Sequence, residues 1–228
     1  MFAVRTMNVR SLRMTNMAKR KKQAIAAGVA AIVAAWLLWP SPYERVKNLA
    51  SPNSAIISFG DSLTAGYGAG AGEDYPSLVA EHLGVPIENA GVSGDTTSSA
   101  LARIDTVLAN NPRMVIIGLG GNDYLRGEAI ATTEANLRTI VKKTQEAGAM
   151  VVLLGFSFPS LNANYASMYE RVADDESCLL IDGVMKGILT DRTLKSDEIH
   201  PNARGYALMA ERIAEPVEKL LREANSAR

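Results

Sequence analysis

The 228-residue sequence contains a single cysteine, Cys178, and only two histidines, His82 and His200. One cysteine excludes an intrachain disulfide. The apolar residues that follow it, Leu179 to Ile181, are typical of a buried strand, so Cys178 is interpreted as an inert core thiol rather than a nucleophile. With two histidines, few positions can hold a general base.

Beyond residue 22 the chain also lacks an excess of basic residues. Residues 1–22 carry seven Lys and Arg and no acidic residue, which leaves 17 basic against 24 acidic side chains in the remainder, a net charge of −7. An acidic body offers no electrostatic footprint for a nucleic acid. The sequence has no internal repeat, and its one low-complexity tract is Gly66–Gly72.

One hydrophobic run follows the basic segment. Its 16 residues, Ala24–Trp39, include no charged or strongly polar side chain. A helix of this length rises about 24 Å, short of a hydrocarbon core of roughly 30 Å, so length alone leaves a cleaved signal peptide and a membrane anchor both open. Trp36 and Trp39 suit an interfacial belt and no small-x-small cleavage site follows closely, which favours an uncleaved anchor.

The chain is therefore divided into a basic segment (1–23), a signal-anchor or signal-peptide helix (24–40), a linker (41–53) and a globular domain (54–228). The positive-inside rule predicts that the basic end stays in the cytoplasm and the remainder faces the periplasm or cell exterior. Signal cleavage would instead give a secreted protein. A start at Met17 is also open, because the Ala-Lys-Arg-Lys-Lys after it makes a more ordinary signal start.

Behind the linker, short apolar runs alternate with amphipathic stretches. Strands buried on both faces are predicted at 55–59, 114–119, 150–156 and 179–181, with a weaker one at 86–90. Helices are predicted at 75–83, 97–109, 133–147, 162–173 and 203–223. This order predicts a three-layer α/β/α sandwich around a parallel sheet, with ligands bound at the carboxyl ends of the strands.

Polar residues follow the predicted strands at those ends. Ser62 comes just after the first strand, where its hydroxyl would be exposed as a candidate nucleophile. Gly94 follows the second strand and Asn122 the third, so the Ser62 N–H, the Gly94 N–H and the Asn122 amide would form a three-donor oxyanion hole. Taken singly, these residues are equally well explained as helix caps and turns.

His200 lies three residues after Asp197. This spacing lets both side chains project from one turn, so the carboxylate accepts the Nδ1 hydrogen and leaves Nε2 free to take the serine proton. In isolation the pair would be better explained as exposed loop residues. His82 follows Glu81 within an amphipathic stretch and is interpreted as structural or solvated.

Four segments together resemble the blocks of the SGNH (GDSL) hydrolases, in the expected order, over about residues 54–222. They are Gly60–Leu63, Ser93–Thr96, Gly120–Asp123 and Asp197–Pro201. The middle two, extended to Gly127, are most similar to the bacterial arylesterase, lysophospholipase and acyl-CoA thioesterase group. The resemblance implies the flavodoxin-like fold of these hydrolases, no metal and no organic cofactor. It also implies roles for Ser62 as nucleophile, His200 as base, Asp197 as its partner, and Gly94 and Asn122 as oxyanion donors.

Two loops differ in sequence from the corresponding loops of that group. Tyr124 is a bulky residue after Asn122-Asp123, and a later loop carries aromatic residues where the group often has aliphatic ones. The residues predicted to line the acyl pocket are Asp61, Tyr124, Phe156, Phe158 and Pro159. Because both loops follow strands and could border the acyl pocket, the acyl chain length preferred by relatives does not carry over to this chain by resemblance alone. Core packing explains Phe156 and Phe158 equally well.

These features predict a serine esterase that forms an acyl-enzyme from carboxylic esters or thioesters. Short acyl esters, aryl esters and lysophospholipids are the expected small-molecule substrates, and residues 24–40 the expected membrane contact. A carbohydrate O-acetylesterase or O-acetyltransferase of the cell envelope stays open. So does a catalytically silent envelope-binding module, which would use the same fold without an active serine.

Overall fold

The computed structural model describes residues 22, 25, 27–29, 41–156 and 163–228. They fall into two units, Met1–Ser41 and Pro42–Arg228, and each is considered by itself. The described residues of the first unit between 22 and 29 are helical, and the rest of the predicted anchor lies outside the described residues. Within the described ranges, no helix is both long enough and apolar enough to cross a membrane.

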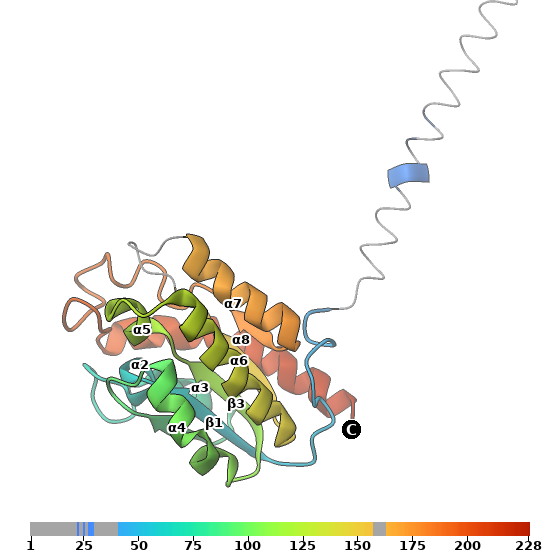
Figure 1. Ribbon diagram of the computed structural model, residues 1–228, viewed down its shortest axis with the longest axis horizontal. Helices are drawn as coiled ribbons and strands as arrows, with labels where there is room; N and C mark the ends of the chain where they lie inside the picture. Colours follow the sequence, from blue (N-terminus) through green and yellow to red (C-terminus); the bar gives the residue numbers. More distant parts are fainter. Residues whose placement is uncertain (1–21, 23–24, 26, 30–40, 157–162) are drawn as a thin grey trace, which may run out of the picture. The chain divides into compact units, whose positions relative to one another are not determined.

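A parallel sheet of five strands forms the centre of the second unit (Figure 1), in the order β2-β1-β3-β4-β5. The strands are β1 (Ala55–Gly60), β2 (Ile87–Gly91), β3 (Pro112–Gly118), β4 (Met150–Leu154) and β5 (Leu179–Ile181). The three central strands are buried almost throughout, whereas β2 at one edge is partly exposed. A half-exposed edge strand carries fewer apolar residues, which is why β2 has the weakest sequence signal.

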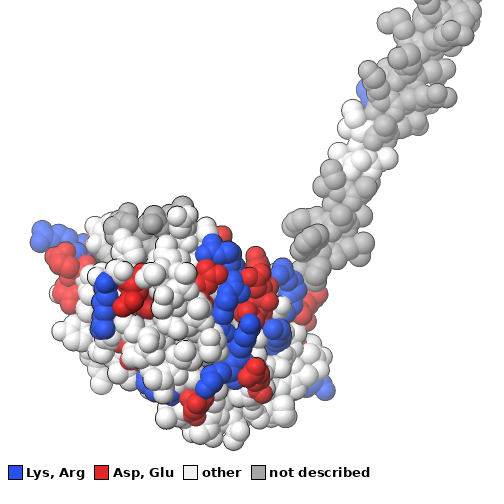
Figure 2. All heavy atoms as spheres, in the orientation of Figure 1, with Lys and Arg blue, Asp and Glu red and all other residues white. Residues whose placement is uncertain are grey.

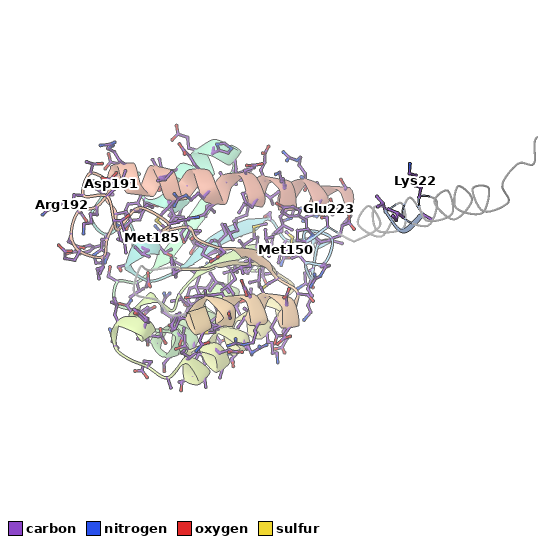
Figure 3. All side chains as sticks on the ribbon, turned by 90° about the horizontal axis from the view of Figure 1, so that it is seen from above. Lys22, Met150, Met185, Asp191, Arg192 and Glu223 are labelled. Carbon is purple, nitrogen blue, oxygen red and sulfur yellow. The ribbon has the colours of Figure 1, made fainter. Side chains whose placement is uncertain are left out.

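Helices cover both faces of the sheet. They are α2 (Ser62–Ala65), α3 (Tyr75–Leu83), α4 (Thr97–Leu108), α5 (Gly121–Leu125), α6 (Ile130–Glu146), α7 (Ala163–Glu176) and α8 (Ala203–Ser226). Helices α3 and α8 pack together on one face, and α4, α6 and α7 pack in that order on the other (Figure 3). The predicted parallel sheet with flanking helices is confirmed.

Several element ends differ from the predicted ones. Helix α6 begins at Ile130, three residues before the predicted start, because the apolar periodicity becomes clear only inside the helix. Strand β4 ends at Leu154, so Phe156 belongs to the loop after it. Strand β3 begins at Pro112, and proline is tolerated at the first position of a strand, where its missing N–H removes no ladder hydrogen bond.

Part of the predicted linker packs against the domain. Val46 is buried, and the Lys47 N–H donates to the Ser177 carbonyl oxygen at 3.1 Å. The Asn48 side chain donates to the carbonyl oxygens of Gln145 and Ala149 at 2.8 and 3.0 Å. These bonds attach residues 46–48 to the amino-terminal side of the sheet.

Charged side chains of both signs are intermixed on the face of the domain shown in Figure 2. On helices α6 and α7 they form ion pairs, among them Arg138 with Glu134 at 2.8 Å and Arg171 with Glu134 at 2.6 Å. Alternating charges of this kind solvate a surface without creating a field of one sign.

Candidate active site

Three glycines at one level of the sheet let helix α2 approach the strands closely. Gly60 at the end of β1 is in register with Gly91 of β2 and Gly118 of β3. A Cβ on Gly60 would lie 2.4 Å from the Gly118 oxygen, and one on Gly91 would lie 2.3 Å from the Ala65 nitrogen. Larger residues would therefore push α2, and Ser62 at its first position, away from the sheet edge.

Side-chain hydrogen bonds then hold α2 in place. The Asp61 side chain caps the helix by accepting from the Leu63 N–H at 2.9 Å. The Thr64 hydroxyl and the Ser58 hydroxyl both bond to the buried Tyr75 hydroxyl, at 2.8 and 2.7 Å. The serine is thus fixed from the strand, from the cap and from helix α3.

The structure brings Ser62 and His200 together although 138 residues separate them in the sequence, with 3.0 Å between Ser62 Oγ and His200 Nε2. On the other side of the ring, His200 Nδ1 lies 2.7 Å from Asp197 Oδ2. A hydroxyl on one ring nitrogen and a carboxylate on the other is the arrangement in which an imidazole can deprotonate a serine.

A closed turn positions the two residues on the His200 side. Asp197 Oδ1 accepts from the N–H groups of Ile199 and His200, both at 2.9 Å, and so leaves Oδ2 for the imidazole. Burial raises the pKa of Asp197, but the Ile199 N–H, the His200 ring and the His200 N–H together hold it below its ordinary value. The carboxylate is therefore ionised at neutral pH and fixes the ring through Nδ1.

Tyr67 adds an aromatic contact that the sequence does not signal. Its ring centroid lies 4.5 Å from that of His200, at an interplanar angle of 46°. Its carbonyl oxygen accepts from the buried Tyr206 hydroxyl at 2.9 Å. Tyr67 lies in a glycine-rich loop, where nothing in the periodicity indicates a neighbour as distant as residue 200.

Asn122 and Gly94 differ in how they lie relative to this pair. Asn122 lines the same cleft as Ser62 and His200, and its amide nitrogen donates to the Asp95 carbonyl oxygen at 2.9 Å. Gly94 has a φ of 87° and is not among the described residues that line the cleft. Its carbonyl oxygen accepts from the Arg126 guanidinium at 2.8 Å, which ties its loop to the end of α5.

The cleft at Ser62 is small, about 20 Å³. Its walls combine polar groups with three apolar side chains, those of Leu63, Leu125 and Ile199. Leu125 is 51% exposed, and Tyr67 and Val92 are also exposed apolar residues of the domain. A cleft of this size encloses only a few atoms of a ligand, so a longer apolar group would extend over the open surface.

Of the residues predicted to line the acyl pocket, some lie in the cleft and others do not. Asp61 lines the cleft. Phe156, for which the sequence leaves pocket and core positions open, is fully buried and does not line the cleft. Its ring centroid lies 6.4 Å from that of Tyr169. Tyr124 packs edge-on against Tyr165 at 5.4 Å and is likewise absent from the lining. Phe158 and Pro159 lie outside the described residues.

Asp61 is a buried carboxylate close to two others, Asp95 and Asp123. Asp95 pairs with Arg103 at 2.6 Å, and Asp123 accepts from the Thr97 N–H at 2.9 Å. Within the part of the chain that the structure describes, no cation lies within 4.0 Å of Asp61. Burial, followed by the charges of Asp95 and Asp123, raises the pKa of Asp61 from 3.8 to about 7.

Replacing Asp61 with asparagine should therefore stabilise the protein at alkaline pH. The raised pKa makes the folded state retain a proton that the unfolded state releases, so wild-type stability falls as pH rises from about 4 to about 7. Asparagine is an equally good cap and cannot ionise. Urea unfolding should show a gain of about 2 to 4 kcal/mol at pH 8.5 that fades towards pH 4. A difference independent of pH would contradict this account.

A family model matches residues 58–208 of the chain, which include Ser62, Gly94, Asn122, Asp197 and His200, and its description is GDSL-like Lipase/Acylhydrolase family. The chain belongs to this GDSL family. The match covers well over half of the sequence and includes every strand after the start of β1. The SGNH resemblance that the four segments indicate is confirmed.

Relatives of this GDSL hydrolase are enzymes that cleave esters. It is 30% identical over 181 residues to thioesterase 1/protease 1/lysophospholipase L1 of Escherichia coli (strain K12), covering 75% of this chain and 87% of that one. It is 31% identical to esterase TesA of Pseudomonas aeruginosa and 30% identical to the arylesterase of Vibrio mimicus, each over 178 residues, 73% of this chain and 89% of theirs. The chain is a serine ester hydrolase of this type.

Solved structures of esterases are also similar to this GDSL hydrolase. The crystal structure of TesA matches with a TM-score of 0.70 at 30% identity, covering 74% of this chain and all of that one. The psychrotrophic esterase EstA of Pseudoalteromonas sp., in a structure inhibited by monoethylphosphonate, matches with a TM-score of 0.68 at 30% identity, over 75% of this chain and all of that one.

Proposed function

We propose that this enzyme hydrolyses esters by double displacement, with Ser62 as nucleophile, His200 as general base and Asp197 as the group that orients the imidazole. The observation that carries the proposal is the pair of distances on either side of the ring, 3.0 Å to Ser62 Oγ and 2.7 Å to Asp197 Oδ2. His200 Nε2 takes the serine proton as Oγ bonds to the carbonyl carbon. The same proton then passes to the departing alcohol or thiol, and water releases the acid in the second half-reaction.

The oxyanion that forms in each half-reaction would lie among the Ser62 N–H, the Gly94 N–H and the Asn122 amide. Ser62 opens a helix, so its N–H has no partner within that helix and points outward. Asn122 is supported by its place in the same cleft. Gly94 is supported by its lack of a side chain and by the Arg126 bond that holds its loop.

Asn122→Ala should lower kcat for p-nitrophenyl butyrate by about 10²- to 10³-fold with little change in KM, because the lost donor acts on charge that develops only in the transition state. Asn122 also bonds to the Asp95 carbonyl oxygen, so folding is checked by the melting temperature. Asn136→Ala, which removes an amide that donates to the Thr97 hydroxyl, serves as the matched control. Equal kinetics for the two variants would remove Asn122 from the oxyanion hole.

The substrates proposed are short acyl esters, aryl esters and lysophospholipids, with thioesters accepted by the same chemistry. The apolar side chains of Leu63, Leu125 and Ile199 beside Ser62 favour an acyl or aryl group, and the small cleft favours a short one or one that extends over the surface. The names of the relatives, which include a lysophospholipase and an arylesterase, support the same range.

A fluorophosphonate probe followed by an ester series tests this proposal. The probe should label Ser62, since a relative is inhibited by a phosphonate, and the full chain should hydrolyse p-nitrophenyl esters from acetyl upward and a lysophospholipid. Activity confined to acetyl groups would favour the carbohydrate O-acetylesterase. Absence of both labelling and turnover would favour a catalytically silent binding module.

The proposal includes attachment to a membrane through residues 24–40, with residues 41–228 facing the periplasm or cell exterior. Its support is the apolar run behind the basic segment, with Trp36 and Trp39 at its end. The mass of the N-terminal peptide from the native host, measured in membrane and soluble fractions, separates anchor from cleaved signal. A mature chain that begins near residue 41 would overturn the anchor.

A further inference from the structure

A second cavity, of about 320 Å³, lies at the amino-terminal edge of the sheet. It is lined by Ser54, Ala55, Ile56, Val85, Pro86, Arg113, Leu221 and Asn225. These residues surround the beginnings of β1, β2 and β3, whereas Ser62 follows the end of β1. In Figure 3, Met150 at the start of β4 and Glu223 on α8 lie at one end of the domain, and Asp191 and Arg192, in the segment leading to Asp197, lie at the other. The cavity is therefore separate from the active site.

Arg113 is a buried cation that lines this cavity. Only 9% of its surface is exposed, yet within the described ranges no carboxylate lies within 4.0 Å of it. One terminal nitrogen donates to the neutral Asn225 side chain at 2.7 Å, and Nε has no hydrogen-bond partner. A desolvated charge and an unpaired N–H both cost free energy, so such a group is expected to have a partner.

A second guanidinium group, that of Arg228, lies near Arg113. Burial lowers the pKa of Arg113, and the nearby guanidinium of Arg228 lowers it further. Arg228 donates to the carbonyl oxygens of Ser51 and Asn53, and the Asn53 side chain donates to the carbonyl oxygen of Pro112, the neighbour of Arg113. Of the described buried side chains, Ser51 Oγ and Arg113 Nε are the two polar atoms without a partner. Two guanidinium groups therefore lie near each other at this edge of the sheet.

The remaining walls are apolar, with Ile56, Val85, Pro86 and Leu221 facing the same space. A volume of about 320 Å³ is at the lower end of the range for small-molecule sites, which is about 300 to 1,000 Å³. An ion alone would leave these walls without contacts. A ligand with one anionic end and one apolar chain would satisfy both parts of the cavity.

We propose that this cavity binds a single-chain amphipathic carboxylate, whose charge pairs with the Arg113 guanidinium and whose chain lies along the apolar walls. The site does not depend on the hydrolytic reaction, although a carboxylate of this class is also what ester cleavage releases.

Binding of octanoate to the full chain in nanodiscs, measured by titration calorimetry against empty nanodiscs, tests the proposal. Arg113→Met should weaken binding by about 10- to 100-fold, as expected for loss of a charged hydrogen bond. Ser54→Glu places a carboxylate at an exposed position in the wall, where it should pair with Arg113 and exclude octanoate. This second variant keeps the test valid even where Arg113→Met fails to fold.

Arg171→Gln, which removes an exposed cation paired with Glu134, is the matched control and should bind as the wild type does. Acetate carries only the anionic part and octanol only the apolar part, so both should bind at least tenfold more weakly than octanoate.

Octanoate binding that persists unchanged in Arg113→Met and Ser54→Glu would overturn the site. Equal binding of acetate and octanoate would overturn the role of the apolar walls. Arg113→Met, Ser54→Glu and Arg171→Gln should all retain ester hydrolysis. Loss of octanoate binding with hydrolysis intact therefore reports on this cavity, whereas a protein without hydrolytic activity reports on the proposed function.

Discussion

Ser62→Ala is expected to lower kcat/KM for p-nitrophenyl butyrate by about 10⁴- to 10⁶-fold while the protein stays folded. The variant removes the oxygen that forms the acyl-enzyme in the proposed mechanism. The backbone groups of residue 62 remain, so any residual rate reflects oxyanion stabilisation and binding alone.

Folding should survive because of what the Ser62 hydroxyl contacts. The bond it makes is to His200 Nε2, whereas α2 is held by Asp61, Thr64 and Tyr75. Ser98→Ala, at an exposed position of α4, is the matched control and should keep full activity. Phosphonate labelling of wild type and Ser98→Ala but not of Ser62→Ala would assign the nucleophile. Turnover in Ser62→Ala within tenfold of the wild type would exclude Ser62.

Asp197→Asn is expected to lower kcat by about 10⁴-fold with KM nearly unchanged. The asparagine side chain would retain its Oδ1 as acceptor for the N–H groups of Ile199 and His200, so the turn should keep its shape. Its amide N–H₂ would then face His200 Nδ1 and donate to it. The ring proton would move to Nε2, which could no longer accept the proton of Ser62.

The control for this variant is Asp191→Asn. Asp191 also accepts a backbone N–H, that of Thr193 at 2.8 Å, two residues further along an exposed turn, but it does not contact His200. A loss below tenfold in Asp197→Asn, or an equal loss in Asp191→Asn, would contradict the orienting role. A large rise in KM would indicate instead that the turn had collapsed.

Local sequence predicted most of the elements. Helix α3 runs over Tyr75–Leu83, as predicted, because Asp74 caps its start and Gly84, with a φ of 65°, ends it. Strands β1, β3 and β4 could be predicted from the sequence because strands buried on both faces consist of nearly uninterrupted apolar runs. The short helices α2 and α5 have too few turns for periodicity to be detected.

Contacts between distant segments could not be predicted from local sequence patterns. The tilted contact between the Tyr67 and His200 rings joins two loops, and the Arg103 guanidinium reaches both Asp95 and the Gly60 carbonyl oxygen from helix α4. The burial of Phe156 followed only from the place where β4 ends and α7 packs. Such contacts depend on how distant segments are packed, and no spacing along the chain encodes them.

The sequence by itself determined the order of strands and helices, the four segments that mark the family and the residue types required for ester hydrolysis, since these depend on periodicity and on chemistry at fixed short spacings. Tertiary structure alone decided that the Ser62 hydroxyl lies 3.0 Å from the His200 ring, that Asp61 is buried beside two carboxylates, and that Arg113 lines a cavity with no carboxylate of the described residues within 4.0 Å. The physical reason is that distance, desolvation and charge pairing arise only when segments far apart in the chain pack together.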